Sequence, residues 1–310
     1  MKVSIIIRCL NEDKHIGKLL DGIQKQDYIG EIEVIVVDSG SRDQTLAIAK
    51  QYPTKIVQIK PEDFSFGYAL NVGCEAATGD ILLFASAHVY PVYNDWVTLM
   101  AQPFEREQVA LVYGKQRGNH LNKYSEHQVF AKWFPDQSNP NQNHPFCNNA
   151  NCAIRRSLWQ AQPYDESLTG LEDLAWAKQI QADGHQIAYQ ADATIIHVHE
   201  ETWANVYNRY RREAIAFRLI NKNESFNIFT FLNLLTKNIL SDARQARHEG
   251  HFWSKIGEIF RFRWNQYYGT YRGYKESYLL DNEVRERFYY PKGYLAKDDS
   301  QERASKRIDY

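Results

Sequence analysis

Cysteine is scarce in this sequence, with four residues in a chain of 310. Cys9 and Cys74 lie in apolar segments, whereas Cys147 and Cys152 lack the spacing of a metal-binding pair. A disulfide framework of the kind that small secreted proteins use is therefore not expected. We predict four reduced thiols in a cytoplasmic protein.

Long apolar runs are missing as well. No stretch reaches the ~18 uninterrupted apolar residues of a membrane-spanning helix, and the apolar run within residues 1–8 is too short for a signal peptide. The formal net charge is −1, which gives no general attraction to nucleic acid or to an anionic membrane. We expect a protein that binds no nucleic acid and that lies, at most, at the inner face of a membrane.

Two signatures of phosphate binding are also absent. The sequence contains neither Gly-x-Gly-x-x-Gly nor Gly-x-x-x-x-Gly-Lys-Ser/Thr, so neither a dinucleotide fingerprint nor a phosphate loop is predicted. A nucleotide bound by this chain would therefore have its base and ribose held by side chains.

Short apolar runs alternate with helical patterns over the first 85 residues. Residues 3–7, 33–37, 55–59 and 81–85 are the predicted strands, and residues 16–23, 43–51 and 68–77 are the predicted helices. Continuous β-branched runs are typical of strands that are buried on both faces of a parallel sheet. Their alternation with helices predicts a doubly wound α/β fold.

Polar residues follow three of the predicted strands. They are Arg8, Asn11 and Glu12 after the first strand, Asp38, Ser39, Ser41 and Asp43 after the second, and Ser86 and His88 after the fourth. Ligands of open parallel sheets bind outside the carboxyl ends of the strands, so we expect a ligand site at this edge. The alternative is that Asp38 and Ser41 only cap a helix.

Five segments in the same order resemble family 2 glycosyltransferases of the GT-A fold. They are residues 4–12 (SIIIRCLNE), 34–45 (VIVVDSGSRDQT), 67–73 (GYALNVG), 147–156 (CNNANCAIRR) and 170–173 (GLED). The resemblance implies a Rossmann-like, mostly parallel sheet flanked by helices, followed by a helical C-terminal part. It also implies that a nucleotide-sugar donor binds at the strand edge. The residues expected at the nucleotide or the donor are Arg8, Asn11, Glu12, Asp38, Ser39, Ser41, Asp43, Asn71, Ser86, His88, Arg155 and Arg156.

An acidic pair is the expected catalytic element. An inverting transfer needs one carboxylate, which removes the proton of the acceptor hydroxyl as its oxygen attacks the anomeric carbon. The resemblance implies that Asp173 is this base and that Glu172 lies beside it. The alternative is that both acids stabilise the first turn of a helix, where the helix dipole favours negative charge.

The sequence departs from the family at the expected metal site. The family normally ends its fourth strand with Asp-x-Asp, which binds a divalent metal at the donor diphosphate, whereas Ser86 and His88 stand in those positions here. Mg²⁺ prefers carboxylates and water, and imidazole suits zinc better than Mn²⁺.

Three interpretations of this departure stay open. In the first, His88 holds a divalent ion, Mn²⁺ or Mg²⁺, together with His197 and His199, which lie two apart on a strand-like segment and hence on one face. In the second, the site is metal-free, and His88, Arg155 or Arg156 neutralises the leaving group. In the third, the protein is an inactive relative.

The remainder of the chain divides into a polar segment and a helical region. Residues 115–146 show little periodicity and are predicted to form a functional loop or lid. From residue 202 the pattern is helical, and we place a boundary near residue 215, between a catalytic domain (1–215) and a helical region (216–310). The last ~15 residues are charged and are expected to fray.

The helical region is rich in aromatic and basic residues. Residues 251–275 carry nine aromatic side chains, interleaved with Arg and Lys, and one acid. Such a helix, with residues 226–240 beside it, would lie at a bilayer interface and suit a lipid-linked acceptor. The alternative is that it packs on the catalytic domain, or on a second subunit of a homo-oligomer.

Together these features predict an inverting glycosyltransferase of cell-envelope polysaccharide biosynthesis. It would move a sugar from a nucleotide-sugar donor to a hydroxyl of a glycan or lipid-linked acceptor, with Asp173 as general base. The alternative function is a degenerate, non-catalytic protein that binds nucleotide sugars or glycans.

Overall fold

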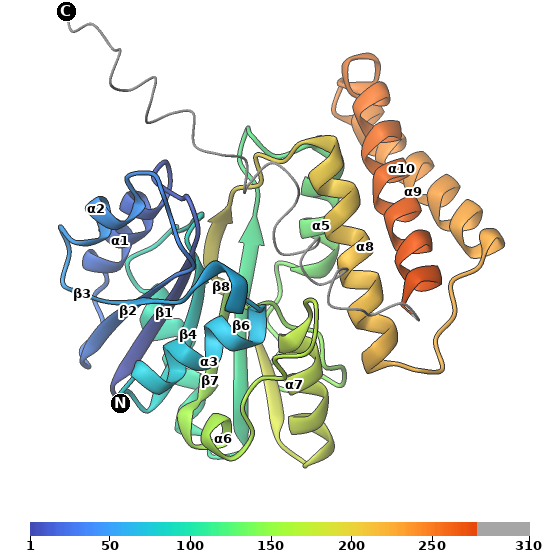
Figure 1. The fold of residues 1–310 in the computed structure, drawn as a ribbon. Helices are drawn as coiled ribbons and strands as arrows, with labels where there is room; N and C mark the ends of the chain where they lie inside the picture. The colour runs from blue at the N-terminus through green and yellow to red at the C-terminus, as the bar shows by residue number, and fades with distance from the viewer. Residues whose placement is uncertain (278–310) are drawn as a thin grey trace, which may run out of the picture.

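The computed structural model describes residues 1–277, which are organised around one eight-stranded sheet with helices on both faces (Figure 1). The strand order is β3-β2-β1-β4-β7-β6-β8-β5. The strands are β1 (Val3–Cys9), β2 (Ile32–Asp38), β3 (Thr54–Gln58), β4 (Ile81–Ser86), β5 (Val89–Pro91), β6 (Val109–Arg117), β7 (Asn151–Arg155) and β8 (Gln186–His197). All four strands predicted from the first 85 residues are confirmed.

The sheet is parallel in one half and mixed in the other. β1 pairs in parallel with β2 and β4, and β2 pairs in parallel with β3. β7 runs antiparallel to both β4 and β6, whereas β6 and β8 are parallel. β5, which follows β4 directly, lies antiparallel to the end of β8 at the sheet margin. This last pairing brings the segments after β4 and β8 together.

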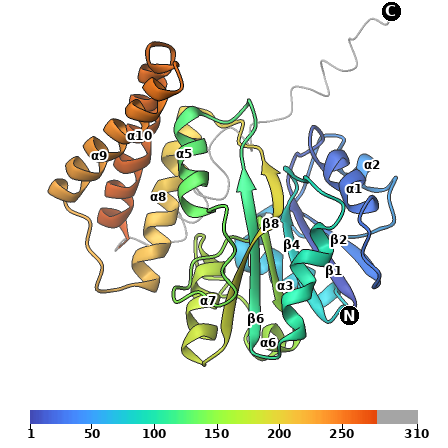
Figure 2. The same ribbon diagram turned by 180° about the vertical axis from the view of Figure 1, so that it is seen from behind.

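Helices cover both faces of the sheet (Figure 2). They are α1 (Ile16–Gln24), α2 (Thr45–Ala49), α3 (Phe66–Ala76), α4 (Trp96–Ala101), α5 (Tyr124–Trp133), α6 (Arg156–Ala161), α7 (Glu172–Ala182), α8 (Trp203–Ile220), α9 (Ile228–His248) and α10 (Phe252–Glu276), with 3₁₀ turns at Pro61–Asp63 and Gln102–Glu105. Ile5 and Ile7 belong to the core on one face, and Ile6 to the core on the other. Because successive strand side chains point to opposite faces, burial of both faces explains the continuous apolar run in β1.

The four cysteines lie in this buried interior and are unpaired. Burial raises the pKa of the Cys74 thiol well above its usual value. This agrees with the prediction of reduced thiols, since an inert buried thiol behaves as a small apolar side chain.

The segment 115–146 is more ordered than its sequence suggests. It contains the end of β6 and the whole of α5. The loop after α5 is tied to β8, because Asn139 and Tyr189 exchange backbone hydrogen bonds of 3.0 and 2.8 Å and the Gln142 N–H donates to the carbonyl of Ile187 at 2.9 Å. The lid prediction is therefore wrong for this part of the loop. Asn and Gln side chains, which lowered its apparent periodicity, are used here for local hydrogen bonds.

The C-terminal helices form an antiparallel hairpin beside α8 (Figure 1). α10 packs along α8, and α9 packs on α10. The buried Arg263 of α10 bonds both carboxylate oxygens of Asp242 on α9, at 2.7 and 2.9 Å. Its guanidinium also donates to the carbonyl of Ser125 on α5, which links the hairpin to the sheet-bearing part.

The predicted boundary near residue 215 falls inside α8, so both parts of the chain share this helix. The division into two domains stays a prediction. Within residues 1–277, no helix has the length and apolarity required to cross a bilayer. The expected fraying of the last ~15 residues lies outside the described part of the chain.

Candidate active site

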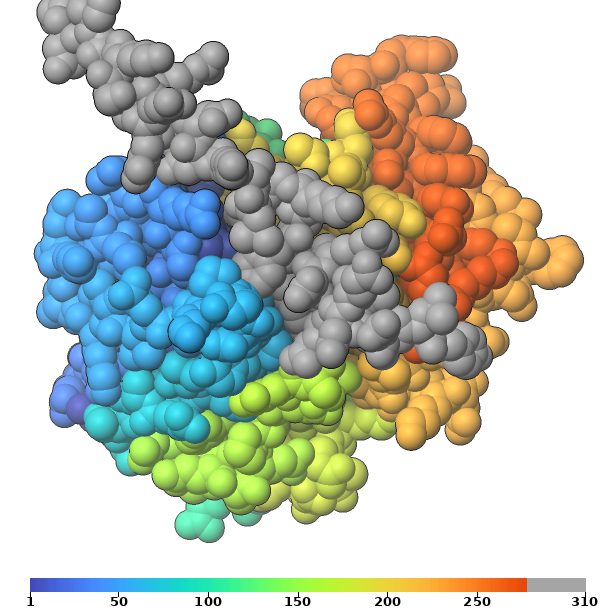
Figure 3. Space-filling view, in the orientation of Figure 1, coloured from blue at the N-terminus to red at the C-terminus, as the bar shows by residue number. Residues whose placement is uncertain are grey.

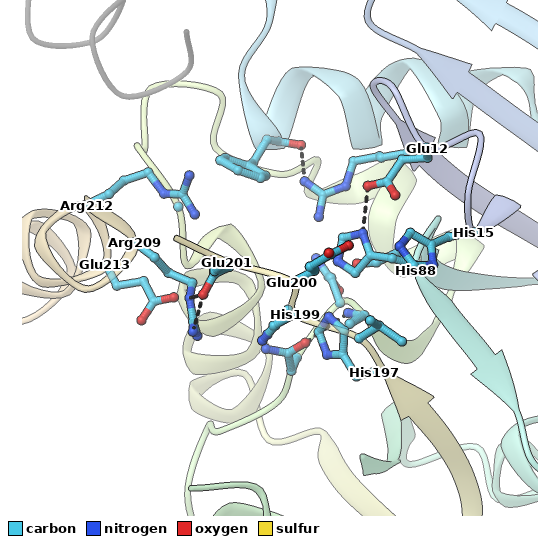
Figure 4. Close-up of a pocket in the computed structure, with 18 of the residues that line it drawn as sticks. Glu12, His15, His88, His197, His199, Glu200, Glu201, Arg209, Arg212 and Glu213 are labelled. Carbon is cyan, nitrogen blue, oxygen red and sulfur yellow. Dashed lines mark hydrogen bonds and ion pairs between the residues drawn. The ribbon is translucent and has the colours of Figure 1, made fainter. Parts of the chain in front are cut away.

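A cavity of about 600 Å³ opens beside the carboxyl ends of the strands (Figure 4). Its wall comes from the segments at the ends of β1, β4 and β8, from residues 148–150, from the start of α7 and from the middle of α8. Residues predicted for the site that line it are Arg8, Asn11, Glu12, Ser86, His88, Glu172, Asp173, His197 and His199. The structure thus brings together strand ends that are almost 200 residues apart in sequence.

Asp173 projects from the first turn of α7 into this cavity. The chain reaches α7 through Gly170 and Leu171, and Leu171 adopts a left-handed conformation with φ of 56°. A non-glycine residue in this region is uncommon and strained. Here the bend directs the acidic pair, Glu172 and Asp173, toward the cavity.

The Asp173 carboxylate is held by two backbone donors and is buried. Its Oδ2 accepts a hydrogen bond from the Asn149 N–H at 2.9 Å, and its Oδ1 accepts one from the Leu174 N–H at 2.8 Å. Burial, and then the neighbouring charge of Glu172, raise the pKa of Asp173 to about 7. Such a carboxyl can take up a proton near neutral pH, which a general base requires.

Glu172 is engaged with Arg8 across the cavity floor. The Arg8 Nη1 lies 3.6 Å from Glu172 Oε1, and the Asn149 side-chain amide donates to the same oxygen at 3.4 Å. The Arg8 guanidinium also lies 4.9 Å from the centre of the Phe66 ring, whose centre is 4.5 Å from Arg212. A positive cluster therefore stands beside the acidic pair.

The segment after β2 supports the cavity without lining it. Asp38 is fully buried, and its carboxylate accepts hydrogen bonds from the N–H groups of Gly40 and Ser41. Ser39 is also buried, and its hydroxyl donates to the carbonyl of Cys9. Ser41 Oγ in turn accepts the Asn11 N–H at 2.9 Å. These residues fix the backbone of the loop after β1.

The same loop is held at two further points. Asp43 Oδ2 accepts the Asp13 N–H at 3.1 Å, and Asn11 Oδ1 accepts the Arg42 N–H at 2.9 Å. Asn11 has a left-handed φ of 55°. It lies before α1, which begins at Ile16 and whose N-cap residue is His15.

Like the segment after β2, three further residues predicted near the donor lie outside the cavity. Asn71 is buried and bonds the Trp159 indole and the backbone of Tyr164. Arg155 pairs with the start of β4, opposite the end that carries His88, and donates to loop carbonyls there. Arg156 begins α6 at that same far edge. We therefore leave Asn71, Arg155 and Arg156 out of the proposed site.

Three histidines meet on the cavity wall (Figure 4). β5 pairs with β8 so that Val89 lies opposite His197, and the Val198 N–H donates to the His88 carbonyl at 3.1 Å. This register sets His88 beside the alternate residues His197 and His199. One ring nitrogen from each of the three lies within 4.8 Å of the other two, so they are able to hold one metal ion.

A network of ion pairs borders the three histidines. The sequence did not predict this network. Arg209 of α8 bridges Glu126 of α5 and Glu201, at 2.6 and 2.7 Å. His199 Nδ1 lies 2.7 Å from the same Glu126, and these charges hold the pKa of Glu126 well below its usual value despite burial. Glu126 falls in the segment predicted as a loop but lies on α5, so its place beside the histidines was not predicted.

The sequence model of the family described as Glycosyl transferase family 2 matches residues 4–161. The chain is 26% identical over 224 residues to the O-antigen chain rhamnosyltransferase RfbN of Salmonella typhimurium, covering 68% of this chain and 70% of that protein. It is 28% identical over 189 residues to the O-antigen chain rhamnosyltransferase WbaN of Salmonella anatum, covering 57% and 60%. The second alignment thus spans less than two thirds of the relative.

Solved structures share the fold at lower identity. The mannosyltransferase PcManGT of Pyrobaculum calidifontis, in complex with GDP-Man and Mn²⁺, superposes with a TM-score of 0.59 at 17% identity, covering 94% of this chain and 87% of that one. Staphylococcus aureus TarS 1-349, in complex with UDP-GlcNAc, gives a TM-score of 0.55 at 19% identity, covering 90% and 91%. These similarities confirm the predicted GT-A-type fold.

Proposed function

The chain belongs to glycosyl transferase family 2, and from this premise we propose that it transfers a glycosyl group from a nucleotide sugar with inversion, with Asp173 as general base. In this reaction the acceptor oxygen forms a bond to the anomeric carbon, and the bond from that carbon to the donor phosphate breaks. The leaving nucleotide keeps the electron pair, and the hydroxyl proton passes to Asp173.

The position of Asp173 carries this proposal. It is the member of the acidic pair that burial and its neighbour bring to a pKa of about 7, while Glu172 is engaged with Arg8 and Asn149. Two carboxyls in contact with different partners take different roles, because each environment sets its own protonation state. We therefore assign proton transfer to Asp173 and positioning of Arg8 to Glu172.

The donor is proposed to bind along the β1–β4 side of the cavity. Asn11 and Glu12 lie on the loop after β1, Ser86 ends β4, and His88 lies two residues beyond it. The buried segment 38–43 would act on the donor indirectly, since it fixes the backbone of the β1 loop. Arg8 would add positive charge where the leaving phosphate gains negative charge.

The acceptor is proposed to approach from the side of α7 and α8. Arg209, Arg212 and Glu213 of α8 line this side of the cavity. The similar proteins RfbN and WbaN are named as O-antigen chain transferases, which supports an envelope glycan as the acceptor class. A hydroxyl on such a glycan would reach Asp173 between the two helices.

A lipid-linked acceptor would also explain the surface of the C-terminal hairpin, which Figure 3 shows at one side of the molecule. Trp253 of α10 is 88% exposed, and Phe229 of α9 is 78% exposed. Exposed basic side chains stand on the same helices, among them Lys237, Arg244 and Arg261. Aromatic and basic residues together favour the interface of an anionic bilayer, so we propose that the hairpin lies against the membrane that carries the acceptor.

Donor use tests the proposed function. Purified protein is incubated with UDP-, GDP-, dTDP- and CMP-activated sugars, activated rhamnose among them, and binding is followed by thermal shift, because a ligand of the folded state stabilises it by mass action. For each donor that binds, release of the free nucleotide is measured with and without lipid-linked glycan. Nuclear magnetic resonance of the product then reports its anomeric configuration. Inversion and acceptor-dependent nucleotide release support the proposal. Binding without any transfer or hydrolysis contradicts it and favours a non-catalytic binding protein.

A further inference from the structure

The carboxylates that normally bind Mg²⁺ or Mn²⁺ at the end of the fourth strand in this family are replaced here by Ser86 and His88. The geometry points to a different metal centre, in which His88, His197 and His199 form a three-nitrogen site for one transition-metal ion of the zinc or cobalt type. The inference deepens the proposed function, on which the metal's role beside the donor rests. The site itself rests on the three side chains and their partners.

The rings of the three histidines are arranged closely. His197 and His199 have centroids 4.1 Å apart in an edge-on contact, and His88 stacks on His197 with centroids 5.2 Å apart. One nitrogen of each ring lies within 4.8 Å of the others. Metal–nitrogen bonds of ~2.1 Å come within reach after a small rotation of the side chains.

Each ring has its Nδ1 engaged by an oxygen acceptor outside the triad. His88 Nδ1 lies 2.7 Å from Glu12 Oε1, His197 Nδ1 lies 2.7 Å from Gln116 Oε1, and His199 Nδ1 lies 2.7 Å from Glu126 Oε1. Carboxylate and amide oxygens accept hydrogen bonds, so the Nδ1 that faces each of them carries the proton. In the neutral rings Nε2 is then left with a lone pair for a ligand.

The side-chain amide of Gln116 lies between His197 and Asn148, and its two hydrogen bonds fix its orientation. Gln116 donates through Nε2 to Asn148 Oδ1 at 3.1 Å, which leaves its Oε1 to accept from His197. All three histidines therefore have the outer partner that a metal-binding histidine almost always has, one that fixes its tautomer and its ring orientation.

His197 is buried, and its Nδ1 faces the amide oxygen of Gln116 rather than a carboxylate. A neutral ring is the form that binds a metal. The outer carboxylates of Glu12 and Glu126 would offset the added positive charge, as Glu126 already does for Arg209.

The ligand chemistry selects the metal. Three imidazoles suit zinc, cobalt, nickel and iron, whereas Mg²⁺ requires oxygen ligands in octahedral geometry. Ser86, which also lines the cavity, supplies one hydroxyl and no carboxylate. A second cluster, Glu126 with His199 and Glu201, is not a competing site, because Arg209 already bridges its two carboxylates.

The test is metal binding by the untagged full chain, stripped with a chelator and dialysed. Co²⁺ is titrated and its visible absorption recorded, since low-coordinate nitrogen sites give a spectrum that hydrated Co²⁺ does not. Competition with Zn²⁺ and with Mg²⁺ follows. We expect one Co²⁺ per chain, displaced by Zn²⁺ and unaffected by millimolar Mg²⁺.

His88→Ala and His197→Ala are the test variants, and His120→Ala, at an exposed position in the loop before α5, is the matched control. Each triad variant should weaken Co²⁺ binding by at least ~100-fold, the upper end of the effect of losing even an outer partner, while the control binds as the unaltered chain does. His88 is partly exposed, so its variant stays informative if His197→Ala fails to fold. Equal binding by His88→Ala and the unaltered chain, or displacement of Co²⁺ by Mg²⁺, would overturn the inference.

Nucleotide-sugar binding and transfer are measured on the same preparations with a chelator present. Transfer without any bound metal would overturn the metal's role beside the donor and leave the proposed function intact. Stoichiometric Co²⁺ binding without transfer under any condition would support the site and contradict the function.

Discussion

The Nδ1 of His197 lies 2.7 Å from the Oε1 of Gln116, in the buried wall between β6 and β8. Gln116 is itself fixed by Asn148, so it acts on the metal site through His197. Gln116→Leu should therefore lower Co²⁺ affinity by about 10–100-fold, the usual effect of losing an outer partner of a metal ligand.

Gln116→Glu separates this positioning role from a general loss of structure. The carboxylate still accepts the His197 N–H, so metal affinity should recover at least partly in this variant. Isothermal titration with Co²⁺ gives both affinities. Equal weakening by Gln116→Leu and Gln116→Glu would mean that the site tolerates no change at this position and would speak against a specific hydrogen-bonded partner.

The pKa of Asp173 predicts opposite pH dependences for activity and stability. A base must be ionised, so kcat/KM should rise as the pH increases through about 7. The pKa of this carboxyl is raised in the folded state above its ordinary value of 3.8. The folded state therefore binds a proton that the unfolded chain releases, and its stabilising contribution is complete below pH ~4 and lost as the pH rises through about 7.

Initial rates and urea unfolding between pH 5 and 8.5 measure both trends on the same protein. In Asp173→Asn the pH dependence of the free energy of unfolding that is due to this group should disappear, because the amide does not titrate. A kcat/KM that is constant over this range, with donor and acceptor far below saturation, would rule out Asp173 as the titrating base.

Much of the fold could be predicted because local pattern and tertiary packing agree in its first half. The apolar run of β1 and the spacing of Leu19, Leu20 and Ile23 in α1 each match the face that the structure buries. The place of Asp173 in the cavity wall could be expected from a motif at one position in the chain. In each case a short window of sequence holds the information.

The parts that could not be predicted depend on contacts between distant segments. Glu126 reaches the site only because α5 packs beside α8, where Arg209 is 83 residues away. Asn71 matches a family motif, yet its amide is used to fix Tyr164. A short stretch of sequence does not distinguish a polar residue that binds a ligand from one that forms hydrogen bonds to buried backbone groups.

The ion pair of Arg263 with Asp242 joins the two helices of the C-terminal hairpin. The two side chains of the pair are 4% and 3% exposed, and they bond at 2.7 Å. Arg263→Ala leaves the buried Asp242 unpaired, which should lower the free energy of unfolding by about 3–5 kcal/mol.

The double variant Arg263→Met, Asp242→Leu is the control, because apolar replacement of both partners of a buried pair is often neutral. Urea unfolding followed by circular dichroism gives the values. If Arg263→Ala unfolds like the unaltered chain, the hairpin is not held by this pair.

Because the hairpin exposes aromatic residues, we expect it to bind anionic membranes. Trp253→Ser with Phe260→Ser should reduce co-sedimentation with anionic vesicles several-fold, since both rings are exposed, by 88% and 53%. Trp133→Ser, 48% exposed at the end of α5, is the matched control. Binding that is lost equally in the control, or absent in the unaltered chain, would contradict a membrane role for the hairpin.

The central claim is that Asp173 takes the acceptor proton in a sugar transfer. Asp173→Asn keeps the size of the side chain and one hydrogen-bond acceptor, so we expect donor binding within about twofold of the unaltered protein. Transfer should fall by at least about 10²–10⁴-fold, the contribution of a positioned base. The direct measurement is kcat for glycosyl transfer alongside the donor Kd, for the unaltered chain and Asp173→Asn. Loss of kcat at an unchanged Kd is the predicted result, and a variant that transfers sugar at the unaltered rate would contradict the account.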